Sequence, residues 1–226
     1  MSKNSDFPHG FVFLDSSMAD DLSVVNSARV SFAKKSELMD EASVGLINFL
    51  MRERHGTPFE HNSFRFNIKC PIFVAREWFR HRIGSFNEFS ARYSEVQDEF
   101  FSPDVSDVRS QVGKPGSYSF ERMNTEDSEA AVAIINKAND DAYRAYKNLI
   151  HMGVAKELAR VVLPVSMYTQ FFWTVNARAL MNFLSLRNAT NAQLEIQRYA
   201  QDIERIFKGQ MPVTYDAWVK NGRVAP

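Results

Sequence analysis

The segment SFRFNIKC, residues 63–70, alternates strictly between apolar and polar side chains. Successive side chains of a strand point to opposite faces, so one face of this segment carries Phe64, Phe66, Ile68 and Cys70. This pattern predicts a half-buried strand. Two further segments have strand character, namely the short apolar run 10–14 and the aromatic and β-branched run 167–175.

Apolar residues at helical spacing predict helices over much of the remaining chain. The expected helices cover residues 18–33, 40–54, 71 to about 82, about 127–152, a shorter stretch ending at 162, 177–187, and a last one ending at about 207. The expected end signals are Gly56 with Pro58 after the second helix, Pro71 opening the third, Asp127 or Ser128 capping the long helix that Gly153 ends, Asn176 capping 177–187, and Thr190 with Gln193 as a capping box.

These elements predict a single α+β domain over residues 1–226, in which a sheet is interleaved with a larger number of helices. Residues 101–127 are polar and interrupted by proline and glycine. We expect this stretch to be a mobile surface excursion.

Composition narrows the classes of function. Lys+Arg and Asp+Glu both count 27, so a nucleic-acid partner is not expected, and any bound anion should meet a local cluster of arginines. The single cysteine cannot form an intramolecular disulfide, which fits a reducing cytoplasm. The polar start MSKNSDFPHG predicts no signal peptide, and no apolar run approaches the roughly 20 residues needed to span a bilayer. We expect a soluble cytoplasmic protein without a membrane partner.

The stretch RHRIGSFNEFSARY, residues 80–93, concentrates the polar chemistry of the chain. An extended backbone would place Glu88, Ser90 and Arg92 on one side and Asn87, Phe89 and Ala91 on the other. Guanidinium forks, an imidazole, a carboxylate, an amide and hydroxyls close together suit a nucleotide ligand. For an arbitrary Arg-His-Arg run, the alternative is a solvated charged loop with internal ion pairs.

This stretch resembles the signature of the flavin-dependent thymidylate synthase family. The matching fixed positions are Arg80, His81, Arg82, Ser85, Asn87, Glu88, Ser90, Arg92 and Tyr93. Blocks similar to the family, in family order, are HGTPFEH (55–61), PIFVAREWFRHR (71–82), LARVVLP (158–164) and FFWTVNARALMNFLSLR (171–187). The resemblance runs from about residue 10 to 207, and only 101–127 is unmatched.

The resemblance implies reductive methylation of dUMP to dTMP, as part of de novo dTMP synthesis. Methylenetetrahydrofolate would supply the carbon, FAD would carry the hydride, and NADPH would re-reduce the flavin. The family uses no protein cysteine as nucleophile. Consistent with this, Cys70 lies on the apolar face of the predicted strand 63–70, where a thiol behaves as a small buried hydrophobe.

The resemblance also implies roles for individual residues. FAD would be bound by Thr57, Arg80, His81, Arg82, Ile83, Asn87, Glu88, Asn176, Arg178 and Asn182, with His55 near the flavin and the folate path. The dUMP site would contain Glu77, Arg80, Glu88, Phe89, Ser90, Ala91, Arg92, Arg160 and Arg187. Arg187 is the candidate catalytic residue, because a fixed cation beside the pyrimidine stabilises developing negative charge. The family implies a homotetramer whose sites are shared between subunits.

Several of these residues have simpler interpretations. Arg160 and Arg178 lie among apolar residues, where an arginine is more often a structural ion pair. A metal site is not expected, because the spacing of His55, Glu60 and His61 differs from a zinc helix. Two positions depart from some relatives, which have glutamine in place of Glu77 and histidine in place of Asn191.

Two other functions compete with this hypothesis. A flavin reductase would oxidise NADPH but would need neither the Ser90 and Arg92 phosphate site nor Arg187. A single-strand-binding module could use the interleaved arginines and aromatic residues of 78–93. Zero net charge and the lack of a basic stripe elsewhere weigh against this second alternative.

Overall fold

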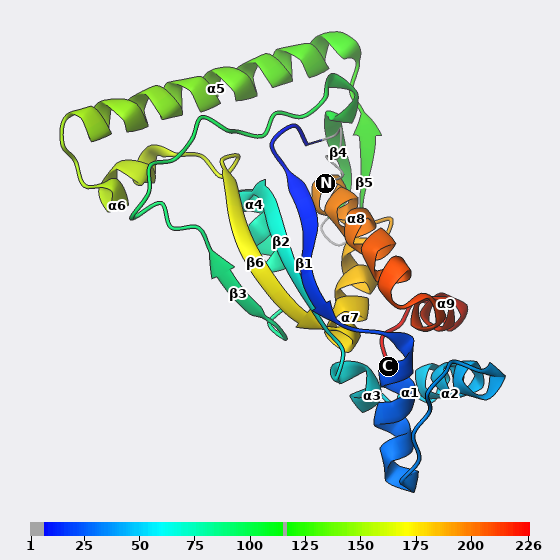
Figure 1. Ribbon diagram of the computed structural model, residues 1–226. Coiled ribbons are helices and arrows are strands. Elements are labelled where there is room, and N and C mark those ends of the chain that lie inside the picture. Colours follow the sequence, from blue (N-terminus) through cyan, green and yellow to red (C-terminus); the bar gives the residue numbers. More distant parts are fainter. Residues whose placement is uncertain (1–6, 115–116) are drawn as a thin grey trace.

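The computed structural model describes residues 7–114 and 117–226, which form one domain of mixed α and β structure (Figure 1). A four-stranded antiparallel sheet has the order β1-β2-β6-β3, and β4 pairs with β5 in a separate hairpin. The strands are β1 Phe11–Met18, β2 Ser63–Pro71, β3 Ser85–Glu88, β4 Arg109–Lys114, β5 Ser117–Arg122 and β6 Tyr168–Asn176. For the described residues, the predicted single domain with both helices and a sheet is confirmed.

The central pair of strands, β2 and β6, builds the core. Their register sets Phe66 opposite Trp173, and the two rings stack with centroids 5.8 Å apart. All four apolar side chains of the alternating segment 63–70 are fully buried, so the predicted half-buried strand is confirmed. Burying a large apolar side chain typically contributes about 1.5–3 kcal/mol, which makes this paired face a major source of stability.

Three helices cover the apolar face of the sheet: α4 Ile72–Trp78, α7 Ala177–Arg187 and α8 Leu194–Gln210. The ring of Trp78 on α4 lies 5.5 Å from Trp173 and 4.8 Å from Phe183 of α7. Tyr199 of α8 completes the group, 6.2 Å from Trp78. All four rings are buried, so these aromatic contacts fix the helices against the strands.

A second group of helices packs beside one end of the sheet (Figure 1). It consists of α1 Asp21–Arg29, α2 Glu41–Arg52, α3 Thr57–Glu60 and α9 Pro212–Lys220, with a 3-10 turn at Val30–Phe32. The buried carboxylate of Asp21 accepts hydrogen bonds from the backbone N–H groups of Val213 (2.9 Å) and Thr214 (2.8 Å). An anion at a helix N-terminus is stabilising, so Asp21 ties the start of α1 to the start of α9.

The long helix α5 Thr125–His151 crosses the opposite end of the molecule and leads to α6 Lys156–Ala159 (Figure 1). A small second core lies beneath it, where Tyr146 is fully buried with Ala91, Val96 and Met167. The Tyr146 hydroxyl accepts a hydrogen bond from the backbone N–H of Val96 at 3.1 Å. This contact holds the segment after β3 against α5.

Several predicted helix ends are wrong. At the end of α2 the left-handed residue is Arg54 (φ 58°), whereas Gly56 (φ −75°) precedes α3, and Pro58 lies in the first turn of that short helix. Helix α4, which was expected to run to about residue 82, ends at Trp78. Asn124, not Asp127 or Ser128, caps α5, although Gly153 (φ +84°) follows its end as expected.

The predicted capping box at Thr190 and Gln193 is also wrong, because α8 begins after Gln193 without a side-chain cap, and α9 was not predicted. The cap of α7 is confirmed, since the Asn176 side chain accepts from the Ala179 N–H at 2.8 Å. These errors share one physical reason: a local end signal is worth about 1 kcal/mol, and tertiary packing overrides it.

The unmatched stretch 101–127 contains ordered elements that the sequence did not predict. The hairpin β4–β5 is exposed along most of its length, and the 3-10 turn Val105–Asp107 precedes it. Two ion pairs tie the stretch to α8: Arg109 with Glu195 (3.3 Å) and Arg198 with Asp107 (2.6 Å). The mobility of this excursion stays a prediction.

Candidate functional site

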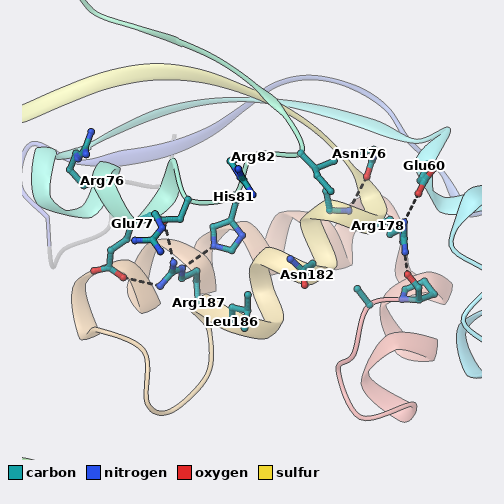
Figure 2. A pocket seen from close by; sticks show the side chains of 15 residues that line it. Glu60, Arg76, Glu77, His81, Arg82, Asn176, Arg178, Asn182, Leu186 and Arg187 are labelled. Atoms are coloured by element: carbon teal, nitrogen blue, oxygen red, sulfur yellow. Dashed lines mark hydrogen bonds and ion pairs between the residues drawn. The ribbon is translucent and has the colours of Figure 1, made fainter. Parts of the chain in front are cut away.

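A cleft of about 1010 Å³ opens between the end of α4, the loop that follows it, and α7 (Figure 2). Predicted site residues that line it are Glu77, Arg80, His81, Arg82, Ile83, Asn176, Arg178, Asn182 and Arg187. They come from segments about a hundred residues apart in the chain. The β2–β6 pairing and the aromatic packing above it bring these segments together.

Helix α7 supplies one wall of the cleft. Arg178, Asn182 and Leu186 recur every four residues, so they share one face of the helix. Residues of the opposite face, such as Leu180 and Phe183, are completely buried in the core. The amphipathic pattern of α7 therefore turns its polar face towards the cleft.

Arg187, at the end of α7, is held by the end of α4 (Figure 2). Its Nη1 lies 3.0 Å from Oε2 of Glu77, and its Nη2 donates to the Glu77 carbonyl oxygen at 3.2 Å. Its Nε donates to Nε2 of His81 at 2.9 Å. Each guanidinium nitrogen makes one of these contacts, so one N–H on each terminal nitrogen remains for a ligand.

Burial and the charge of Arg187 together shift the pKa values of both partners. Burial and the neighbouring Arg187 cation lower the pKa of His81 to about 4. The imidazole is therefore neutral near pH 7, and because Nε2 accepts a hydrogen bond, its proton sits on Nδ1. Burial raises the pKa of Glu77, while the charge of Arg187 opposes that rise.

Arg178 is held at the other end of the cleft. Its Nη1 lies 2.7 Å from Oε1 of Glu60, and its Nε donates to the backbone oxygen of Pro226 at 2.5 Å (Figure 2). A Cβ at Gly56 would lie 2.5 Å from the Arg178 Nε, so any larger residue at this position would displace the arginine side chain. The predicted structural ion pair of Arg178 is thus present, and the residue also lines the cleft.

The cleft carries an excess of positive charge in a chain of zero net charge. Five arginines line it against two glutamates, Glu60 and Glu77, and His81 is neutral. Within residues 7–114 and 117–226, Arg76, Arg80 and Arg82 form no ion pair and no side-chain hydrogen bond. Unpaired guanidinium groups together with the amides of Asn176 and Asn182 suit a phosphate-bearing ligand.

The other predicted site residues do not line this cleft. They are His55, Thr57, Asn87, Glu88, Phe89, Ser90, Ala91, Arg92 and Arg160. Oε1 of Glu88 accepts a hydrogen bond from Thr169 Oγ1 at 2.7 Å. The exposed guanidinium of Arg92 lies 5.2 Å from the ring of Tyr93, and that of Arg160 bonds only to the Glu157 carbonyl oxygen (3.4 Å) within the described chain.

The predicted extended backbone over 80–93 is wrong outside β3. The last backbone hydrogen bond to β6 runs from the Phe89 N–H to the Gln170 carbonyl oxygen (2.8 Å). The carbonyl oxygen of Ser90 then accepts from the N–H groups of Tyr93 (3.1 Å) and Ser94 (3.2 Å). The chain therefore turns at Ser90, so Ser90 and Arg92 do not share one face of a strand. Ala91 is buried in the second core.

Six lining residues were not predicted: Glu60, Arg76, Ala179, Leu186, Ala225 and Pro226. Arg76 precedes Arg80 by four residues, and this spacing could have indicated it. Ala225 and Pro226 reach the cleft only through the fold, and no local sequence pattern indicates them.

No group of three or more His, Cys, Asp or Glu side chains in the described chain is arranged to hold a metal, and no helix there is long and apolar enough to cross a membrane.

Comparisons with known proteins agree with one another. Residues 13–213 match the family model described as "Thymidylate synthase complementing protein". The chain is 49% identical over 211 residues to the flavin-dependent thymidylate synthase of Thermosipho africanus, covering 93% of this chain and 91% of that protein. It is 44% identical to the enzyme of the same name from Tropheryma whipplei, covering 92% and 91%.

Two crystal structures of the UMP/dUMP methylase PolB from Streptomyces cacaoi have a similar fold. The structure with 5-Br UMP has a TM-score of 0.89 at 44% identity and covers 96% of both chains. The structure with 5-Br dUMP has a TM-score of 0.88 at 45% identity and covers 96% of this chain and 97% of that one. The chain therefore belongs to the family of flavin-dependent thymidylate synthases.

Proposed function

We propose that the protein methylates dUMP to dTMP, with methylenetetrahydrofolate as the carbon donor, FAD as the hydride carrier and NADPH as the reductant. The family and the names of its relatives support this reaction. The observation that carries the proposal is the arrangement of Arg187, whose guanidinium is held by Glu77 and His81 with N–H groups left for a ligand.

The positively charged cleft fits a flavin dinucleotide. Its pyrophosphate would be held by arginines from the loop after α4, and its polar groups by residues of α7. The residues assigned to the flavin are Arg80, His81, Arg82, Ile83, Asn176, Arg178 and Asn182 in the cleft, and Thr57, Asn87 and Glu88 outside it. When bound, FAD would supply the hydride chemistry that no amino-acid side chain provides.

The proposed dUMP site combines two groups of residues. Glu77, Arg80 and Arg187 lie in the cleft, whereas Arg160 and the turn 88–92 lie outside it on the same chain. The second group includes exposed cations, Arg92 and Arg160, which suit the phosphate. We propose that a homotetramer completes each site, with the turn of one subunit facing the cleft of another.

Within such a site the side chains would bind, orient and stabilise charge. The cation of Arg187 stabilises the negative charge that develops on the pyrimidine as C5 becomes nucleophilic. Glu77 and neutral His81 fix the orientation of the Arg187 guanidinium, since both accept hydrogen bonds from it. Cys70 is fully buried, and burial raises the pKa of its thiol, so it is unsuited to attack the substrate.

UMP is a second candidate substrate, because PolB, the relative in both solved structures, is described as a UMP/dUMP methylase. Purified protein would be incubated with FAD, NADPH and methylenetetrahydrofolate, and with dUMP or UMP in parallel. Formation of dTMP that depends on FAD supports the proposal. NADPH oxidation without any methylated nucleotide would instead support the flavin reductase alternative.

The first prediction concerns Cys70. Cys70→Ala removes a buried thiol that no step uses, so dTMP formation should stay within a few-fold of the wild-type rate. Steady-state turnover measured on protein with full FAD content checks this. Abolished turnover in folded, flavin-loaded Cys70→Ala protein would contradict a mechanism without a protein thiol.

The second prediction concerns His81. Its pKa in the folded protein, about 4, lies below the ordinary value of 6.5, so between these values the unfolded chain binds more protons. The contribution of His81 to stability is complete above pH 6.5 and declines as the pH falls towards 4. Urea unfolding of the apo-protein at pH 7 and pH 5 should therefore show a larger loss of stability for wild type than for His81→Asn. Equal losses would contradict a neutral His81.

The third prediction separates catalysis from binding at Arg187. Lysine keeps the charge but loses the planar fork that Glu77 and His81 hold, so Arg187→Lys should lower kcat and kcat/KM together by about tenfold to a hundredfold. Flavin content and NADPH-driven flavin reduction should change little. A variant with normal kcat and only a raised KM for dUMP would show that Arg187 binds without activating.

The fourth prediction tests the shared site. Arg92→Ala and Arg187→Ala should each be inactive, but mixed oligomers contain some sites with neither mutation. Co-refolding the two variants should therefore restore part of the activity, measured as dTMP formation. If mixed oligomers are verified and no activity returns, each site is built within one chain.

A further inference from the structure

The last residues of the chain, 222–226, form a short segment that we call the strap. After α9 the backbone reverses through two left-handed residues, Gly222 (φ +81°) and Arg223 (φ +58°). The segment then reaches the cleft, where Ala225 and Pro226 line the wall near Arg178. The proposed function assigns no role to these residues.

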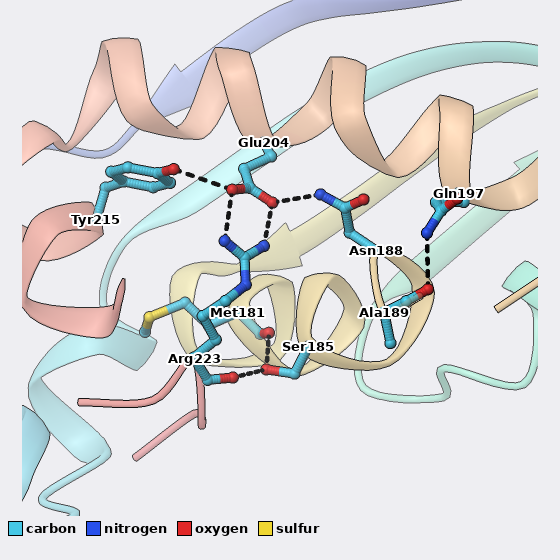
Figure 3. Close-up of polar contacts among 8 residues, drawn as sticks. All are labelled: Met181, Ser185, Asn188, Ala189, Gln197, Glu204, Tyr215 and Arg223. Atoms are coloured by element: carbon cyan, nitrogen blue, oxygen red, sulfur yellow. Dashed lines mark hydrogen bonds and ion pairs between the residues drawn. The ribbon is translucent and has the colours of Figure 1, made fainter. Parts of the chain in front are cut away.

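One end of the strap is anchored by Arg223 (Figure 3). Its Nη1 lies 2.9 Å from Oε1 of Glu204 on α8, and its Nη2 donates to Oε2 of the same carboxylate. Glu204 also accepts from Asn188 (2.6 Å) and from the Tyr215 hydroxyl (3.0 Å). The guanidinium carbon lies 4.3 Å from the ring centre of Trp218, so the anchor combines a bidentate pair with a cation–π contact.

The backbone of the strap is also fixed to α7. The Ser185 hydroxyl contacts the carbonyl oxygen of Arg223 and that of Met181 (Figure 3). Ser185 lies three residues after Asn182, which lines the cleft. Ser185 therefore fixes the strap on the side of α7 that also carries the cleft residues Arg178 and Asn182.

The other end of the strap meets Arg178. The backbone oxygen of Pro226 accepts a hydrogen bond from Arg178 Nε, while Glu60 holds Nη1. The Arg178 side chain is 46% exposed, so without these contacts it would sample many rotamers. The Glu60 carboxylate and the Pro226 backbone oxygen come from separate segments, and together they restrict the Arg178 side chain to one direction.

We infer that the strap is a positioning element for cofactor binding: Arg223, anchored on Glu204, holds Pro226 in place, and Pro226 orients Arg178. This inference rests on the proposed function, because it takes FAD as the ligand that Arg178 meets. Fixing a binding group before the ligand arrives strengthens affinity by lowering the ordering cost. Arg223 contacts no ligand itself and acts only through Arg178.

The test measures FAD affinity of the full-length protein by quenching of flavin fluorescence. Arg223→Ala should raise the Kd for FAD about tenfold, because an outer partner of a binding residue is lost. The matched control is Arg198→Ala, which removes another arginine–carboxylate pair of α8, with Asp107, away from this cleft. The control should keep the FAD Kd within about twofold, even where its melting temperature falls as far as that of Arg223→Ala.

A double-mutant cycle then asks whether Arg223 acts through Arg178. In an Arg178→Ala background, the further change Arg223→Ala should alter the Kd by less than about twofold. If Arg223→Ala fails to fold, Ser185→Ala replaces it in the same cycle. This change removes the contact to the strap backbone but leaves the Glu204 carboxylate paired with Arg223.

The outcomes separate the strap from the proposed function. Wild-type protein that does not bind FAD at all would overturn both. Wild-type affinity in folded Arg223→Ala or Ser185→Ala protein would overturn the strap alone. Two results would show that the strap stabilises the fold and does not orient Arg178. One is a double variant whose rise in Kd is the product of the rises in Arg178→Ala and Arg223→Ala. The other is a loss of FAD affinity in Arg198→Ala equal to that in Arg223→Ala.

Discussion

The antiparallel pairing of β2 with β6 is the constraint on which the rest of the structure depends. Each strand passes directly into a helix, β2 into α4 and β6 into α7, and the two helices start at opposite ends of the pair. Both fold back over the same apolar face, where Trp78 and Phe183 stack. Their far ends consequently meet, and this brings Glu77 beside Arg187.

Electrostatics within the cleft divides the arginines into two kinds. Arg178 and Arg187 are held by carboxylates and carbonyl oxygens, so their directions are fixed before a ligand binds. Arg76, Arg80 and Arg82 are unpaired in the described chain and provide charge without fixed direction. A site of this kind can attract an anionic ligand through the second group and orient it through the first. The chain as a whole needs no basic excess for this, because the charge is local.

The sequence predicted the parts of this arrangement that depend on local pattern. The alternation over 63–70 gave a buried strand, and the Arg-His-Arg run marked one wall of the cleft. Prediction from the sequence failed where tertiary packing overrides weak helix-end signals. At the end of α2, for example, Arg54 and not Gly56 takes the left-handed conformation. It also missed Pro226, since no pattern near the end of the chain indicates a contact with Arg178. The turn at Ser90 was missed because its hydrogen bonds are backbone contacts that many sequences can make.

We propose that flavin and pyrimidine meet in the cleft beside Arg187. The most direct measurement is a crystal structure of the protein grown with FAD and dUMP. We expect a flavin along the loop 80–83 and α7, and a pyrimidine within hydrogen-bond distance of Arg187, with Glu77 still bound to Arg187. A pyrimidine bound elsewhere, with Arg187 facing only Glu77 and His81, would contradict it.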